Sequence, residues 1–395
     1  RPNMGALYLA GEVNRTRRHQ AWIQDLNHTS YHELVEENIE WFNPDFIGIS
    51  TTTPYYYWWS NFAKHLKHNH PNIKLIAGGP HATVKPEDCG MFDHVVIGEG
   101  EKALVNIMDG KGATLNYGVP VRNLDELAGP DWTCLDMKRY GINQEGHKTM
   151  TILSSRSCSQ NCMFCTKNIL GKVQRIQSNE RTIEEIKKLK DKYGYDSFYF
   201  LDDCFTENRS RVFDLCQRLQ PLKISFRATS RTDYVTKELI QSMIDGGMRS
   251  ISYGLEHMDD KVLEATQKQN KASNNRFAVL LAKDRGLKVR GSFILNLPGA
   301  TKESMYKCLE FAQESNMDFA DYYSLIAYPG TPLWERPGDY GAEITDKSYN
   351  FFQTAGRTNV RYRGQDLDEF YEIADDIRKK WKEFKGSEVP WESKK

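Results

Sequence analysis

Three cysteines lie within eight consecutive residues, and this spacing constrains the chain more than any other feature of its sequence. Cys158, Cys162 and Cys165 are separated by three and by two residues, in a segment that follows a strand-like stretch and is expected to open a helix. One loop of this kind can carry three thiolates to three corners of a cubane iron–sulfur cluster and leave one iron without a protein ligand. Catalytic zinc also takes three ligands, but usually recruits His or a carboxylate, and this loop has neither. Three unrelated buried cysteines are the remaining interpretation, and their density argues against it.

Length and charge limit the class of protein. A chain of 395 residues is long for one core, so two domains and a terminal extension are expected. Lys+Arg and Asp+Glu are equal at 53 each, which provides no global attraction to nucleic acid or to an anionic membrane. Apolar runs stop far short of the roughly 20 residues that span a bilayer, and no secretory signal is visible. Cysteine thiols must stay reduced in order to bind metal, and a reducing cytoplasm keeps them so.

The first part of the chain alternates strand and helix signals, which is typical of a parallel, doubly wound, Rossmann-like α/β sheet. Helices are expected near residues 5–17, 31–42 and 56–68, with another after Glu101. Strands are expected at 21–24, 46–50, 73–77 and 94–97. We therefore predict one domain over residues 1–114.

Apolar periodicity fades over residues 115–148, where Gly, Pro and Asp accumulate, so a linker is predicted there. Six further strands are expected near 150–154, 197–201, 224–228, 250–254, 289–295 and 321–327, with helices between them. Six β/α units predict a partial barrel over residues 149–330, whose chemistry lies at the carboxyl ends of the strands. Residues 331–395 form a mostly helical extension with a helix near 367–384.

The CxxxCxxC spacing, with Phe164 directly before the third cysteine, resembles the signature of the radical S-adenosylmethionine (SAM) superfamily. The resemblance implies a 4Fe–4S cluster on Cys158, Cys162 and Cys165 whose free iron binds SAM. One electron, from a donor such as flavodoxin or ferredoxin, would cleave SAM to methionine and a 5′-deoxyadenosyl radical. Phe164 is predicted to contact the cofactor.

Three later segments, 200–206, 252–256 and 295–299, resemble strand ends of the cobalamin-associated branch of that superfamily. This branch includes class B methyltransferases and proteins like the anaerobic Mg-protoporphyrin ester cyclase. By that resemblance the residues that contact SAM are Asp202, Asp203, Glu256 and Asn296, with Arg227 or Arg231 as a carboxylate partner. A barrel-rim salt bridge or a helix cap is the alternative for each.

The N-terminal half resembles the cobalamin-binding domain of the same branch. The predicted cofactor-binding residues are Thr51, Thr52, Thr53, Gly78, Gly79, His81, Gly98, Glu99 and Gly100. Two departures stand out: the strand expected before the first helix is missing, and no D-x-H-x-x-G motif supplies a cobalt ligand. A histidine after Gly-Gly-Pro could equally cap its loop. In the aromatic run 55–59, two or three rings are expected in the core and the rest are left for a ligand.

The leading functional prediction is a cobalamin-dependent radical SAM enzyme that methylates an unactivated carbon or phosphorus of a small molecule. An oxidative cyclase or rearrangement enzyme shares the same two domains and stays open. A methylthiotransferase would need a second set of cluster cysteines, and a non-catalytic metal-binding module would need a fourth ligand. Of the isolated cysteines, Cys216 and Cys308 are expected in the core, and packing is favoured for Cys204.

Overall fold

The structure is a computed structural model that describes residues 1–26, 31–144, 146–166, 170–353 and 356–386. The chain forms two compact units. The first consists of Arg1–Ser157, Lys167–Tyr199 and Ser348–Gln353, and the second of Cys158–Thr166, Phe200–Lys347 and Thr354–Lys395.

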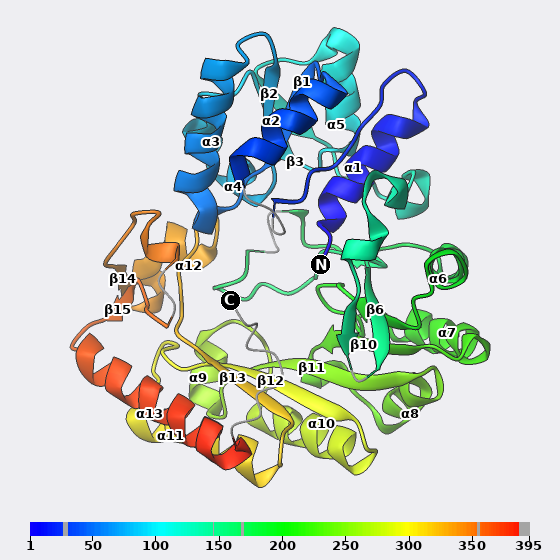
Figure 1. Ribbon diagram of the computed structural model, residues 1–395. Helices are drawn as coiled ribbons and strands as arrows, with labels where there is room; N and C mark the ends of the chain where they lie inside the picture. Colours follow the sequence, from blue (N-terminus) through cyan, green and yellow to red (C-terminus); the bar gives the residue numbers. More distant parts are fainter. Residues whose placement is uncertain (27–30, 145, 167–169, 354–355, 387–395) are drawn as a thin grey trace. The chain divides into compact units, whose positions relative to one another are not determined.

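The first unit contains a parallel sheet in the order β1-β2-β3-β4. Its strands are β1 (Phe46–Ser50), β2 (Lys74–Gly78), β3 (His94–Gly98) and β4 (Leu115–Gly118). The helices between and around them are α1 (Met4–Arg15), α2 (Tyr31–Phe42), α3 (Tyr56–Asn69), α4 (Pro80–Val84) and α5 (Glu101–Asn106) (Figure 1). The predicted alternation of helix and parallel strand is confirmed.

The prediction of a strand at residues 21–24 is wrong, because this segment is irregular. Its backbone bonds to a side chain rather than to another strand: the Ala21 N–H donates to Asn14 Oδ1 at 2.7 Å, and Asn14 Nδ2 donates to the Ala21 carbonyl at 3.4 Å. A short apolar run without a pairing partner does not form a strand.

The core of the first unit lies between the helices and the sheet. Trp59, Ala63 and Leu66 on α3 are buried against Leu75 and Ala77 of β2. Their spacing of three and four residues places them on one face of the helix. In the aromatic run, Trp59 is 1% exposed, and Tyr56 and Trp58 pack partly buried against the same cluster, which confirms two or three rings in the core. Tyr55 and Tyr57 reach solvent, and a ligand role for any of these rings stays a prediction.

A second sheet has the order β13-β12-β11-β10-β9-β6-β5. The strands are β5 (Ile142–Gln144), β6 (His147–Ile152), β9 (Ser197–Phe200), β10 (Ser225–Ser230), β11 (Met248–Glu256), β12 (Lys288–Ile294) and β13 (Phe319–Tyr323). Strands β10 to β13, all in the second unit, pair in parallel, and β5 pairs with β6 as an antiparallel hairpin. All six predicted barrel strands are present, which confirms the α/β fold class.

Helices connect the parallel strands. They are α6 (Asn179–Tyr193), α7 (Arg209–Leu219), α8 (Lys237–Asp245), α9 (Asp260–Ala265), α10 (Ala272–Asp284) and α11 (Lys302–Glu314). Five of them begin after a side chain that accepts a backbone N–H, namely Ser178, Asn208, Thr236, Asp259 and Thr301. In Figure 1, α10 and α11 run along one face of β11, β12 and β13.

After the last barrel strand come α12 (Pro332–Glu335), the hairpin of β14 (Ala342–Ile344) and β15 (Val360–Tyr362), and α13 (Leu367–Lys385). The long terminal helix is confirmed. Among the described residues, none of the helices has the length and apolarity that crossing a membrane requires.

Candidate active site

The cysteine loop connects the two strands of a short antiparallel ribbon. Strand β7 (Ser155–Arg156) pairs with β8 (Arg175–Ile176). The helix expected directly after the cysteines falls on residues 167–169, which lie outside the described residues. The chain first returns to pair with β7, and α6 begins only after its cap at Ser178.

Backbone hydrogen bonds anchor the loop within the second unit. The Ser159 N–H donates to the Glu207 carboxylate at 3.1 Å, and the Met163 N–H donates to the Thr266 carbonyl at 3.1 Å. The Met163 carbonyl accepts from the Leu333 N–H at 3.0 Å. The Met163 side chain is fully buried in an apolar cluster, and Phe164 packs against the same cluster. The middle of the loop is thus fixed by burial, while Cys158 and Cys165 remain partly exposed.

Cys204 lies beside the first thiol of the loop. A hydrogen bond from Cys204, the largest influence, lowers the pKa of Cys158 although burial opposes it. The same hydrogen bond and burial raise the pKa of Cys204, so Cys204 is the donor of this bond and the Cys158 sulfur is the acceptor. A thiol that is more easily deprotonated is a better metal ligand.

The Cys162 environment contains both signs of charge. Burial raises the pKa of its thiol to about 11, with Lys268 and Arg231 lowering it and Glu256 raising it. Lys268 Nζ lies 2.7 Å from Glu256 Oε1 and also bonds to the Gly254 carbonyl. Arg231 donates to the Lys268 carbonyl at 2.6 Å. Two cations close to a buried sulfur favour its thiolate form when a metal replaces the proton.

The chemistry of the donor set fits an iron–sulfur cluster. Cys158, Cys162 and Cys165 lie on one loop, and none of the three is in a disulfide. As they stand, no three Cys, His, Asp or Glu side chains in the described ranges converge closely enough to hold an ion. Three thiols without an imidazole or carboxylate between them suit iron–sulfur ligation better than catalytic zinc.

The predicted SAM contacts are engaged with protein partners at the strand ends. Asp202 is buried and lies 3.6 Å from Arg211, and Asp203 follows it on the same loop. Asn296 accepts the Leu325 N–H at 2.5 Å and donates to Thr358 Oγ1 at 3.0 Å. Asn296 thus links the segments that follow β12 and β13, whereas Asp202 pairs with helix α7. Contact of these residues with SAM stays a prediction.

The remaining two predicted SAM contacts lie on neighbouring strands. Arg227 is half-buried on β10, and its register partner on β11 is Ser250. Glu256, at the end of β11, has a φ of 63°. A positive φ is costly for a residue with a Cβ and often marks a functional site.

In the first unit, the predicted cobalamin-binding residues occupy the loops that follow three parallel strands. Thr51 Oγ1 donates to the Gly78 carbonyl at 2.8 Å and accepts the Ala82 N–H at 3.0 Å. The Thr52 carbonyl accepts from Trp59 Nε1 at 3.1 Å. Gly79 has a φ of 96°, and a Cβ there would lie 3.0 Å from the Thr51 carbonyl oxygen. These turns therefore need glycine for their own close packing as well as for any approach of a ligand.

Two more of these residues belong to the loop after β3. Gly98 has a φ of 87°, and its N–H donates to Thr83 Oγ1 at 3.0 Å. A Cβ on Gly100 would meet the Leu9 side chain at 2.9 Å. The loop ends of β1, β2 and β3 lie at one edge of the sheet because the strands are parallel, which fits a bound cofactor at that edge.

His81 is completely buried in a polar and aromatic cluster. Its Nδ1 lies 3.0 Å from Thr53 Oγ1, and its Nε2 lies 3.2 Å from Asp88 Oδ2. Burial lowers its pKa although Asp88 opposes the shift. Tyr349 contacts the ring edge-on at 5.1 Å and donates to Asp88. Both ring nitrogens face protein groups, so a role toward cobalt stays a prediction.

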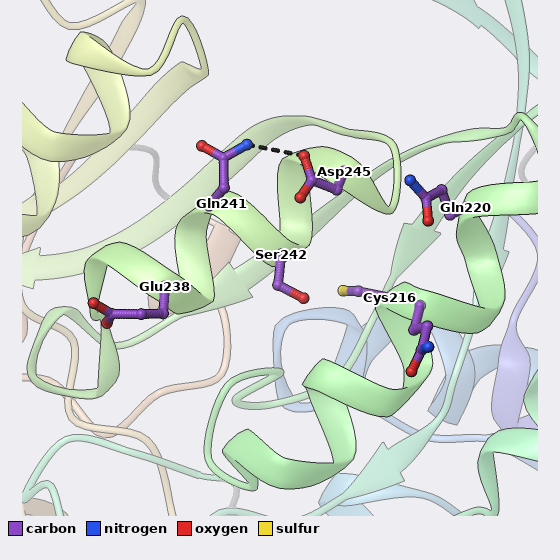
Figure 2. A pocket seen from close by; sticks show the side chains of 7 residues that line it. Cys216, Gln220, Glu238, Gln241, Ser242 and Asp245 are labelled. Atoms are coloured by element: carbon purple, nitrogen blue, oxygen red, sulfur yellow. Dashed lines mark hydrogen bonds between the residues drawn. The ribbon is translucent and has the colours of Figure 1, made fainter.

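A separate pocket of about 410 Å³ lies on the second unit between α7 and α8 (Figure 2). It is lined by polar side chains, including Gln220 and Glu238, and Gln241 donates to Asp245 at 2.8 Å. Cys216 borders it but is 1% exposed. None of the predicted site residues lines this pocket.

Comparison with known proteins decides the family. Residues 2–108 match the B12 binding domain, and residues 152–312 match the Radical SAM superfamily. An uncharacterized methyltransferase of Pyrococcus horikoshii is 32% identical over 365 residues, which cover 85% of this chain and 78% of that protein. The chain belongs to the radical SAM superfamily. It is a radical SAM enzyme with a B12 binding domain, which implies SAM, a 4Fe–4S cluster and cobalamin as cofactors.

Other relatives of this radical SAM enzyme differ in activity. The anaerobic magnesium-protoporphyrin IX monomethyl ester cyclase of Cereibacter sphaeroides is 26% identical, over 85% of this chain and 60% of that protein. Among solved structures, the methyltransferase TsrM from Kitasatospora setae has a TM-score of 0.69 at 16% identity, covering 84% of this chain and 72% of that one. OxsB has a TM-score of 0.67 at 16% identity, and the match covers 95% of this chain and 54% of that one. These two structures share the fold.

The sequence did not indicate two contacts beside the cysteine loop. Cys204 is 1% exposed, which confirms its predicted packing, and its hydrogen bond to Cys158 is the contact that the sequence left out. The pairing of Lys268 with Glu256 could not be predicted from the sequence, because it depends on how the chain returns from α9 toward α10.

Proposed function

We propose that this chain holds a 4Fe–4S cluster on Cys158, Cys162 and Cys165, cleaves SAM reductively and methylates an unactivated carbon or phosphorus of a small molecule. When bound, the cluster would supply one electron to SAM, and cobalamin would supply the methyl group. The observation that carries the proposal is the set of three cysteines outside any disulfide on one anchored loop, with no His, Asp or Glu between them. The methyltransferase relative from Pyrococcus horikoshii supports methyl transfer.

The residues of the chain would bind and orient. Cys204 favours the thiolate of Cys158 through its hydrogen bond. Lys268 and Arg231 would offset negative charge at Cys162, and Glu256 offers a carboxylate to the ammonium group of SAM. The buried Met163 keeps one side of the loop dry, which strengthens electrostatic contacts made there. Free thiols are consistent with a reducing cytoplasm, where flavodoxin or ferredoxin would deliver the electron.

The test is anaerobic reconstitution with iron and sulfide, followed by reduction in the presence of SAM. We expect 5′-deoxyadenosine from the wild-type chain and none from Cys162→Ala. A wild-type chain that binds iron but forms no 5′-deoxyadenosine would contradict the proposal. With methyl-labelled SAM, a cell extract and mass spectrometry, a methylated product gains the label.

The similarity to the magnesium-protoporphyrin ester cyclase favours a second candidate, a radical oxidative cyclase that also uses cobalamin. The same labelling experiment separates the two. A cyclase consumes SAM and releases 5′-deoxyadenosine, but leaves the methyl label in methionine.

A further inference from the structure

A buried ion cluster lies next to the residues that precede the cysteine loop. Glu99, from the loop after β3, and Glu101, the first residue of α5, face Arg156 of β7 and Arg175 of β8. All four side chains are 10% exposed or less. Arg156 lies 3.3 Å from Glu99 and 2.7 Å from Glu101. Two buried cations and two buried anions balance, so the cluster is stable only as a complete set.

Glu99 is the centre of this cluster. Arg175 donates to both of its oxygens, at 2.6 and 2.9 Å, and the Val121 N–H donates to Oε2 at 3.1 Å. Burial alone would raise the pKa of Glu99, but the bond from Arg175 and the charge of Arg156 outweigh it and lower the pKa. Glu99 is therefore ionised, and its carboxylate is occupied by protein groups.

The cluster reaches the turn that starts the cysteine loop. Ser157, directly before Cys158, is 1% exposed and has a φ of 68°. A residue with a Cβ holds this left-handed conformation only where its surroundings impose it. Ser157 Oγ donates to the Leu170 carbonyl at 3.2 Å, and Arg175 donates to Ser157 Oγ at 3.5 Å and to the same carbonyl at 3.4 Å.

We propose that Glu99, Arg156 and Arg175 are positioning residues that hold the Ser157 turn and thereby fix the direction in which Cys158 approaches the iron–sulfur cluster. The inference rests on the proposed function, since it assumes that Cys158 is a ligand. In this proposal Glu99 supports the turn before the cysteine loop, whereas the sequence predicted that it contacts a cofactor. Groups that orient a metal ligand typically change metal affinity by about 10- to 100-fold when they are replaced.

The experiment uses the full chain, reconstituted anaerobically, in the variants Glu99→Gln and Glu99→Asp. Iron and sulfide per chain are measured after desalting, together with the EPR spectrum of the reduced cluster with and without SAM. We expect Glu99→Gln to retain iron about 10-fold less well and to show a changed spectrum, because the neutral amide leaves two buried arginines poorly compensated. Glu99→Asp keeps the charge and should recover part of the loss.

Glu185→Gln is the matched control. Glu185 is a buried carboxyl of the same unit, on α6, and burial raises its pKa to about 7. The isosteric amide should leave iron content and the EPR spectrum unchanged.

A second variant tests the turn itself. Glycine adopts a φ of 68° without strain, so Ser157→Gly in the Glu99→Gln background should restore iron binding toward the wild-type level. Should Glu99→Gln fail to fold, Arg175→Lys takes its place, since it keeps the charge but not the full set of hydrogen bonds.

The outcomes separate the two proposals. A wild-type chain that takes up no iron overturns the proposed function and the positioning role with it. The positioning role alone is overturned if the wild-type chain forms a normal iron–sulfur cluster and Glu99→Gln, or Arg175→Lys in its place, shows the same iron content and EPR spectrum. Loss of iron in Glu99→Gln that Ser157→Gly does not restore overturns it as well.

Discussion

Replacing Lys268 by methionine isolates the energy of a buried ion pair in the second unit. The side chains of Lys268 and Glu256 are 4% and 12% exposed, and Nζ lies 2.7 Å from Oε1. Methionine fills nearly the same space but leaves the Glu256 carboxylate without its cation and the Gly254 carbonyl without a donor. Removing one partner of a buried pair costs about 3–5 kcal/mol, so Lys268→Met should lower the free energy of unfolding by that amount.

The double variant Lys268→Met/Glu256→Gln removes both charges at once. It should therefore be less destabilised than the sum of the single variants, with a coupling energy of about 1–3 kcal/mol. Urea unfolding of the cofactor-free chain, followed by circular dichroism, measures all three free energies of unfolding.

The matched control is the pair of Lys283 and Asp318, which has a similar distance of 2.8 Å but side chains 25% and 26% exposed. Solvent screens this pair, so Lys283→Met should cost at most about 1 kcal/mol. Equal costs for Lys268→Met and Lys283→Met, or additive effects in the double variant, would refute the reasoning.

Three further predictions follow from buried groups. Burial lowers the pKa of His257 to about 4, so between pH 6.5 and 4 the unfolded chain gains a proton that the folded chain does not. The free energy of unfolding should fall by about 3 kcal/mol as the pH drops through that window and be constant above it. The variant His257→Asn still accepts the Asp259 N–H but should not show this pH dependence, which urea titrations at several pH values measure. The Glu185 carboxyl, whose pKa burial raises to about 7, costs stability as pH rises from 4.5 to 7. Glu185→Gln should therefore be more stable than wild type by about 3 kcal/mol at pH 8 but not at pH 4, and a constant difference would contradict the assignment. Gly254→Ala would place a Cβ 2.5 Å from Glu256 Oε1. It should therefore lower the free energy of unfolding by about 1–3 kcal/mol and lower the melting temperature. A variant as stable as the wild type would show that the carboxylate moves freely.

Local signals in the sequence were sufficient for most of the helices and strands. Helices α7 and α8 lie between barrel strands as predicted, because each has an apolar face of helical period and a capping side chain in front of it. The parallel order of β10 to β13 followed from the alternation of strand and helix. The strand predicted at 21–24 was wrong because the side chain of Asn14 takes the backbone hydrogen bonds of Ala21.

The sequence by itself determined the three thiols, because a metal-binding loop keeps its ligands within a few residues and leaves them visible as spacing. Only the tertiary structure decided which charges meet. Glu99 pairs with an arginine 76 residues away, and Glu256 pairs with a lysine on a returning loop. The free energy of such a pair depends on burial and distance, and long-range packing sets both. Periodicity and spacing are local properties of a chain, whereas the partner of a buried charge is a property of the fold.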